Sequence, residues 1–477
     1  MLSNDATAVN HGLTSALLIP RAADTPTVKR GTSGWRWYCL IIVSGISGLQ
    51  GGYWANFGPI TEAVEPLFGW GDEDIALLAN WGPIMFLLAA APTAWMLDVA
   101  GLRTSCIVAS ALVFVGSVLR CVHVQPDTMG SALMHAGQIV NAVAGPVAMA
   151  AGPVLSALWF PPSERTFATA VVGTCNYGGT AAMFVLGPML VPSGDSSADT
   201  AENLRLYMIG EAAVGLALFI GALCFPRAPA VLPSISAGMP RVANGGGFAR
   251  LRRVPAFWAF ALSYGLTCGV FAGWGSMIGP NLAAVLPDDV AEEQAGWMGF
   301  GGAIAGVVGG VGLSAYADTR GKKKPLLVGL VVASVVSSLG FALLCAFPEP
   351  PSSPSSEAEP ASGDEQASVS SGRLAALYAT SIATALCVNA AVPLFYECAV
   401  EAAYPIAEGL VTTVLTVSMN VAALLFLLVP YVPNLGTQWM NWTLAASCLV
   451  AVHVVCPLAE PRRRLQIDVD EVHPAQE

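Results

Sequence analysis

The chain has 477 residues, of which 55% are hydrophobic and only 11% are charged, and its mean hydropathy is +0.62. Soluble proteins carry about 25% charged residues, so this composition excludes an ordinary soluble protein. The formal net charge of −11 falls largely in predicted outer loops and gives no indication of nucleic-acid binding.

Apolar stretches recur along the chain, each of about 20 residues and long enough to cross a bilayer core as a helix. They predict an all-α membrane protein whose immediate partner is the lipid bilayer. We expect twelve spans near 37–60, 75–97, 104–123, 131–153, 166–191, 205–225, 256–278, 297–316, 325–347, 374–396, 410–432 and 439–458.

Basic residues predict the orientation. With twelve spans both termini lie on one side, and 18 of the 21 Lys and Arg residues fall on that side. The positive-inside rule therefore predicts cytosolic termini, and we expect the plasma membrane as the location. The apolar run Leu13–Pro20 is too short for a cleavable signal peptide. The eleven cysteines show no CxxC spacing, so neither a metal site nor a cofactor is expected.

The composition also predicts the domain organisation. We expect a disordered cytosolic tail (1–34), a six-helix half (35–225), a cytosolic linker (226–255), a second six-helix half (256–460) and a polar, disordered cytosolic tail (461–477). The loop 348–372 has almost no apolar content and is predicted to be a disordered outer excursion.

One loop motif occurs twice. Asp98-Val-Ala-Gly101-Leu-Arg103 follows the second span, and Asp318-Thr-Arg320-Gly321-Lys-Lys323 follows the eighth, at an offset of 220 residues. Glycine permits a tight reversal, and the acid and base can form pairs at the cytosolic surface. We predict a cytosolic gate at these turns, in which Asp98 and Arg103 bridge to the other half when the inside is closed. The alternative is that the basic residues only orient the protein in the membrane, as the positive-inside rule describes, and that the nearby aspartates are there by chance.

A second pair of loops repeats at an offset of 244 residues. Phe160-Pro-Pro-Ser-Glu164 precedes Arg165 after the fourth span, and Tyr404-Pro-Ile-Ala-Glu408 follows the tenth. These loops fall on the same side as the first pair, so Glu164 and Glu408 are candidate acidic partners in the gate. Two repeated halves with a site between them are typical of transporters that alternate access.

Aromatic and amide side chains at mid-depth predict the lining of a central site. Such a box suits a small ammonium group, because cation–π contacts hold the charge and amides orient the polar end. For any single tryptophan, core packing or an interfacial position remains the alternative. The candidate substrate-binding residues are Trp54, Asn56, Phe57, Trp81, Phe86, Gln138, Asn141, Trp274 and Asn420.

The repeated turns and the twelve spans resemble the major facilitator superfamily. Within it the chain resembles the feline leukaemia virus subgroup C receptor-related family of haem/choline-type transporters. The segments that carry this resemblance are GGYWANFGPI (51–60), NWGPIMFLLAAAPTAWMLDVAGLR (80–103), GSVLRCV (116–122), GQIVNAVAGPVAMAAGPVLSALWFPPSERTFATA (137–170) and ECAVEAAYPIAEG (397–409).

The resemblance implies a transporter of a small organic solute, such as a choline- or ethanolamine-like amine, in which Trp54 cages the ammonium group. The sequence departs from that family at Gly145, where a glutamine is expected, and at Ala272, where a tyrosine is expected. A haem or other metabolite transporter and a non-transporting receptor on the same fold are the alternatives. No motif of an intramembrane enzyme is present, so we predict no enzymatic activity.

Ionisable residues inside the spans bear on energy coupling. Glu211 in the sixth span is the mid-membrane candidate for a proton carrier, but a neighbouring polar group or water can also satisfy it. We therefore expect a monomeric uniporter that works by facilitated diffusion.

Overall fold

The computed structural model describes residues 31–192, 196–283, 285–286, 288–347, 371–429 and 436–470. Most of the 1–34 tail and of the 348–372 loop therefore lies outside the described residues. Over the described part of the chain the structure is helical, with one bridge of extended backbone between Val242 and Ile406.

Six spans form the first half. The fourth span is made of two consecutive helices that meet at Ala144. These spans are α2 (Trp35–Ala55), α4 (Asp72–Trp95), α5 (Gly101–Val122), α6 (Thr128–Val143) with α7 (Gly145–Trp159), α8 (Arg165–Leu190) and α9 (Ser197–Leu223). The short helices η2 (Gly58–Ile60) and α3 (Thr61–Phe68) follow α2.

Six further spans form the second half, which confirms the twelve-helix fold for the described residues. These spans are α12 (Pro255–Tyr264) continued by η4 (Gly265–Gly269) and α13 (Val270–Ser276), α15 (Asp288–Arg320), α16 (Lys323–Ala346), α17 (Ser371–Ala403), α18 (Glu408–Leu428) and α19 (Gln438–Val455). The short α14 (Ile278–Ala283) precedes α15.

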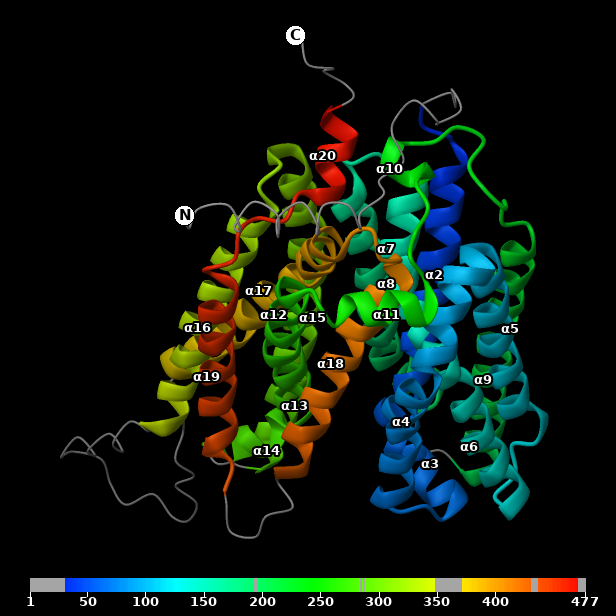
Figure 1. Cartoon of the computed structure of the whole chain (residues 1–477). Helices are drawn as coiled ribbons and strands as arrows, with labels where there is room; N and C mark the ends of the chain where they lie inside the picture. The colour runs from blue at the N-terminus through cyan, green and yellow to red at the C-terminus, as the bar shows by residue number, and fades with distance from the viewer. Residues whose placement is uncertain are drawn as a thin grey trace, which may run out of the picture.

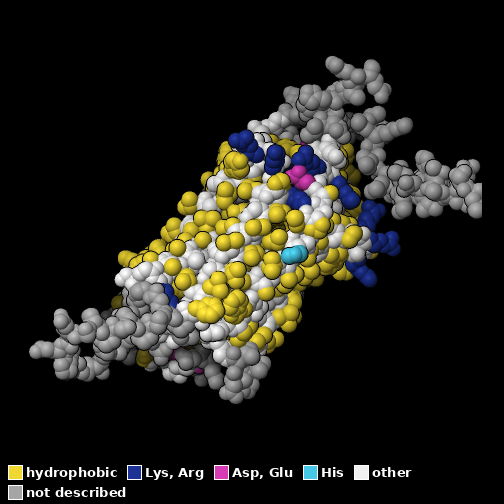
Figure 2. Space-filling model, turned by 90° about the vertical axis from the view of Figure 1, so that its left-hand side faces the viewer, with side chains coloured by type: hydrophobic (Ala, Val, Ile, Leu, Met, Phe, Trp, Pro, Cys, Tyr) yellow, Lys and Arg dark blue, Asp and Glu magenta, His cyan; other side chains and the backbone are white. Residues whose placement is uncertain are grey.

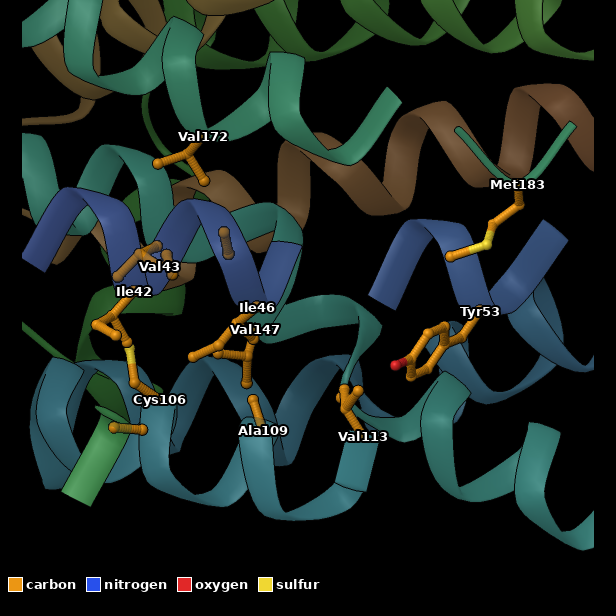
Figure 3. Packing of buried hydrophobic residues seen from close by; sticks show 14 of the residues in the cluster. Ile42, Val43, Ile46, Tyr53, Cys106, Ala109, Val113, Val147, Val172 and Met183 are labelled. Atoms are coloured by element: carbon orange, nitrogen blue, oxygen red, sulfur yellow. The ribbon is translucent and has the colours of Figure 1, made fainter. Parts of the chain in front are cut away.

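Each half has its own apolar core. One buried cluster draws only on residues between 39 and 225, and two others draw only on residues between 251 and 455. Figure 3 shows the first cluster, where Ile42, Val43 and Ile46 of α2 lie near Ala109 of α5 and Val147 of α7. None of these three clusters contains residues of both halves. The two bundles seen side by side in Figure 1 are therefore separate packing units.

The outer faces of the helices suit a membrane. Eight continuous helical stretches of the described residues are long and apolar enough to cross a bilayer, and one of these, Leu77–Val122, contains two spans joined by the π-turn η3 (Met96–Ala100). Large apolar side chains such as Leu88, Val308 and Val336 are exposed. Figure 2 shows a broad apolar surface, with Lys and Arg gathered toward one end. Apolar side chains on such a face contact lipid tails, so their exposure carries none of the free-energy cost that it would have in water.

The segments after the two halves are helical and lie at one end of the molecule. The linker contains α10 (Ile235–Gly238) and α11 (Asn244–Leu251), and the C-terminal segment forms α20 (Arg463–Asp470). We call this end the linker side; α10 and α20 mark it at the top of Figure 1, whereas α11 lies lower in that view, beside α18. The prediction that 461–477 is disordered is wrong for α20, because its charged residues find buried partners described below. The remainder of that tail lies outside the described residues.

Candidate functional site

The glycines of the two repeated turns both have a positive φ. Gly101 has φ +83° and Gly321 has φ +64°, the left-handed region that residues with a Cβ rarely adopt. Each glycine lets the chain reverse between two adjacent spans on the linker side. The sequence-based explanation of these glycines is confirmed.

The aspartates of both turns join the two halves. Asp98 of the first half accepts hydrogen bonds from the backbone N–H groups of Gly409 (2.8 Å) and Leu410 (2.9 Å), which begin α18 of the second half. Asp318 of the second half accepts from the backbone N–H of Phe167 (2.9 Å) and from the Thr166 hydroxyl, which begin α8 of the first half.

These two contacts are equivalent under the internal repeat. The first four N–H groups of a helix have no partner within that helix, and its N-terminus carries partial positive charge, so a carboxylate there is a favourable cap. Each half therefore caps a helix of the other half. The linker side of the molecule is closed by this reciprocal arrangement, which we call the seam.

The basic residues of the repeated turns have other partners. Arg103 donates to the backbone oxygens of Phe225 (2.6 Å) and Leu223 (3.1 Å) at the end of α9, within its own half. Arg320 lies over the ring of Tyr316 on its own helix. The expected bridge from Arg103 to the other half is therefore not formed in this conformation, because the carbonyl groups at the end of α9 are nearer acceptors.

The second pair of loops supplies charges around the seam. Glu408 accepts from Arg241 of the linker at 2.9 Å, whereas Glu164 pairs with Arg36 of its own half at 3.0 Å. Arg165, the first residue of α8, pairs with Asp468 of α20 at 3.3 Å. Of the acidic candidates, Glu408 contacts the linker and Glu164 stays within the first half.

Several predicted pocket residues instead brace the first half. Arg120 of α5 is fully buried and forms an ion pair with Glu211 of α9 at 3.0 Å. Asn56 donates to the same carboxylate at 3.0 Å, and Gln138 accepts from Arg120 at 3.2 Å. Asn141 donates to the backbone oxygen of Gln50 at 3.4 Å. The amides of Asn56 and Gln138 are engaged in this internal network, which the sequence did not reveal.

Replacing Arg120 with glutamine is expected to lower the free energy of unfolding by about 3–5 kcal/mol, because Glu211 then keeps a buried charge without its base. Arg205→Gln is the control, because Arg205 is an exposed arginine of α9, the helix that carries Glu211. Thermal unfolding of both variants in detergent measures the effect. Equal unfolding temperatures for the two variants would contradict this role of the network.

The predicted aromatic residues of the first half occupy different environments. Trp81 donates to His135 at 3.2 Å, Phe57 packs edge-on against Trp70, and Phe86 is buried. Trp54 remains 39% exposed. Its Nε1 donates to the backbone oxygen of Ala79 at 2.8 Å.

A glycine of α4 makes room for the Trp54 ring. A Cβ added at Gly82 would stand 2.2 Å from Trp54 Nε1, so only glycine fits beneath the indole. The edge of the ring is thereby fixed against α4 while part of its surface stays accessible. Of the predicted tryptophans of the first half, Trp54 is the more exposed, although it is not among the residues that line the cavity described next.

The departure from the resembled family at Gly145 has a structural counterpart. A Cβ at Gly145 would lie 3.3 Å from Gln50 Nε2 and 3.6 Å from the Phe86 ring. A side chain at position 145 would therefore begin close to the amide of Gln50 and in contact with the Phe86 ring. Gln50 of α2 therefore brings an amide to the place where the resemblance predicts one from the fourth span.

A cavity of about 620 Å³ lies between the halves, away from the seam. Its walls come from α8 of the first half and from α13, α14, α15 and α17 of the second. Rings and uncharged polar groups dominate the lining, and no Asp, Glu, Lys or Arg is among its described residues. The rings and polar groups are Tyr177, Phe184, Phe271, Trp274, Phe300, Thr180, Ser276, Ser381 and Asn389.

A smaller void continues from the cavity toward the seam. Tyr177, Ala303 and Asn389 line both spaces, and Thr169, close to the capped start of α8, lines the smaller one. Among the predicted residues, Trp274 lines the large cavity, whereas Asn420 donates to Thr416 of its own helix at 2.9 Å. Asn389 was not predicted, although a lone amide within an apolar span was a usable signal.

Comparison with known proteins agrees with this architecture. The family model described as Major Facilitator Superfamily matches residues 40–351. The "Solute carrier family 49 member 4 homolog" of Xenopus tropicalis is 32% identical over 469 residues, covering 95% of this chain and 96% of the relative. The "Choline/ethanolamine transporter FLVCR2" of Homo sapiens is 23% identical over 413 residues, covering 84% of this chain and 73% of the relative.

Solved structures share the fold. The transporter FucP, in a structure titled as the outward conformation, matches with a TM-score of 0.66 at 13% identity, covering 87% of this chain and 97% of FucP. The proton:xylose symporter XylE matches with a TM-score of 0.68 at 13% identity, covering 91% of this chain and 98% of XylE. The chain therefore belongs to the major facilitator superfamily of membrane transporters and, within it, to solute carrier family 49.

Proposed function

We propose that this transporter moves a small organic amine of the choline or ethanolamine kind by facilitated diffusion. The observation that carries the proposal is the cavity between the halves, whose described lining offers aromatic rings, hydroxyls and an amide but no formal charge. Aromatic faces attract a cation without a carboxylate, and an amide orients its polar end. Several relatives of this chain are named choline/ethanolamine transporters, among them FLVCR2 of Homo sapiens and flvcr2b of Danio rerio.

The gate follows from the position of the seam. We place the linker side in the cytosol, on the strength of its basic residues. The aspartate caps then hold the cytosolic side closed while the cavity lies toward the outside. Release of both caps lets the halves separate on the cytosolic side, which gives alternating access to one site.

A uniport mechanism fits the charged groups inside the first half. Arg120 and Glu211 pair with each other between α5 and α9, two helices of the same packing unit. A pair that moves as part of one rigid half keeps its environment through the transport cycle. Such a pair braces the structure and has no reason to exchange a proton with the cavity.

A metabolite comparison tests the substrate class. Cells with and without the protein are compared for accumulated small molecules, and the compounds that differ most are then offered as labelled tracers. We expect small amines among these compounds, with uptake that saturates and depends on the protein. Enrichment of anionic or sugar-like compounds instead would overturn the amine proposal and leave the transporter fold standing.

A further inference from the structure

The C-terminal helix α20 contacts both halves. Arg464, near its start, is 1% exposed and lies against the second half, where it pairs with Glu397 at 2.9 Å and Glu401 at 3.0 Å. Glu401 also accepts from the backbone N–H groups of Arg464 (2.9 Å) and Leu465 (3.2 Å). One carboxylate of α17 thus caps the helix and binds its first buried base.

One helical turn later, the same helix contacts the first half and the linker. Asp468 pairs with Arg165, the first residue of α8, at 3.3 Å. It also accepts from the backbone N–H and the hydroxyl of Ser236 in α10, both at 2.8 Å. Residues four apart on a helix lie on the same face, so α20 presents a base to one half and an acid to the other from a single face.

The charges of α20 are continuous with the seam. Glu397 lies between Arg464 and Lys323, and Lys323 lies 3.5 Å from Asp318, the aspartate that caps α8. Burial by itself would lower the pKa of Arg464, but the carboxylates of Glu397, Glu401 and Glu408 hold it above its ordinary value. Arg464 therefore stays charged, and separating it from these acids is costly.

We propose that α20 is a third component of the gate, a clasp that stabilises the closed seam and must release one half before the linker side can open. The proposal rests on the alternating-access function. If α8 moves away from α17, α20 cannot keep both Arg165 and Glu401. The ion pairs of α20 with the second half, at 2.9 and 3.0 Å, are shorter than its ion pair with Arg165 at 3.3 Å, so we expect α20 to release Arg165 and remain on α17.

Hydrogen exchange in the full-length protein tests the clasp without a substrate. The amides of Phe167 and Leu410 are bonded to Asp318 and Asp98 across the closed seam, so their exchange reports opening of this side. In Asp468→Asn we expect exchange at these amides about tenfold faster, which corresponds to about 1.4 kcal/mol. Exchange in α6, which is remote from the seam in sequence and packing, should not change.

Two further variants make the outcome decisive. Ser236→Ala keeps all charges and the Arg165–Asp468 pair, but it removes the hydroxyl that bonds Asp468, Arg165 and Ser234, so it should give a smaller change in the same direction. Arg462→Gln is the control, because Arg462 is 50% exposed and its pair with Glu460 lies outside the clasp. If exchange in Asp468→Asn becomes faster only in α20 and α10, the clasp proposal is overturned. That result would show that α20 binds the protein without stabilising the closed seam. Because no solute is involved, this result is independent of the amine proposal.

Discussion

Asp98→Lys is expected to abolish transport while leaving the amount of protein in the membrane largely intact. Asp98 holds two backbone N–H groups at the start of α18, and a lysine there would place positive charge against the positive end of that helix. The seam then cannot close, and the transporter remains in conformations open on the linker side. Tracer uptake, normalised to surface protein, measures the effect.

A variant on the opposite side of the same contact tests the same closure. A Cβ at Gly409 would lie 2.4 Å from Asp98 Oδ1 and 2.9 Å from the Leu97 Cβ, so Gly409→Ala should also block closure and reduce uptake by at least about tenfold. Gly312→Ala is the matched control, because a Cβ there meets open space. Normal uptake by both Asp98→Lys and Gly409→Ala would exclude the seam as a gate.

Trp54→Ala is expected to remove most of the uptake of an ammonium substrate, and Trp54→Phe should weaken it. A cation over a tryptophan face is stabilised by about 0.5–2 kcal/mol, and tryptophan is the strongest of the aromatic residues in this respect. Loss of about 2 kcal/mol lowers affinity roughly thirtyfold. Initial rates over a range of substrate concentrations separate this loss of affinity from a loss of folded protein.

Gly82→Ala tests the position of the same ring without removing it. The new methyl group would displace the indole from α4 and break its hydrogen bond to Ala79. We expect reduced affinity with an unchanged fold, whereas Gly210→Ala, where a Cβ meets open space, should behave as the wild type. If Trp54→Ala transports normally, the ammonium group is held elsewhere, and the rings of the cavity become the candidates.

The sequence predicted the features that depend on local pattern. Apolar length predicted the twelve spans, and the glycines of the repeated Asp98 and Asp318 turns have the expected positive φ, whereas the gate itself stays a prediction. In both cases a few neighbouring residues determine the outcome. The repeated loops also predicted the two halves, because the same loops occur in the same order at nearly the same offset.

The sequence could not reveal partners that are distant along the chain. Arg120 lies within the predicted span 104–123 and the sequence indicated no partner for it, yet it is buried beside Glu211, 91 positions later. Asp468 belongs to a short polar segment without apolar periodicity, and its partner Arg165 lies 303 positions earlier. In both cases tertiary contact decides the structure, and for Asp468 composition alone favoured a solvated tail.

The side chains of the candidate site show the same limit. Asn56 and Gln138 were predicted to face a solute because amides inside spans need partners, and the structure supplies those partners within the first half. Trp274 was predicted from its ring and does line the cavity. A single sequence shows that a polar group needs a partner, but it does not show whether that partner is protein or solute.

Uptake into proteoliposomes of the purified protein tests facilitated diffusion of a cationic amine most directly. Choline carries a permanent charge, so an inside-negative potential of 100 mV should raise its accumulation roughly fiftyfold at equilibrium, at about 2.3 kcal/mol per charge. Labelled choline and ethanolamine are measured with the potential imposed alone and with a proton gradient imposed alone. We predict that the potential drives choline accumulation and that the proton gradient has little effect. Protein-dependent accumulation of neither amine, or accumulation driven only by an inward proton gradient, would contradict the account.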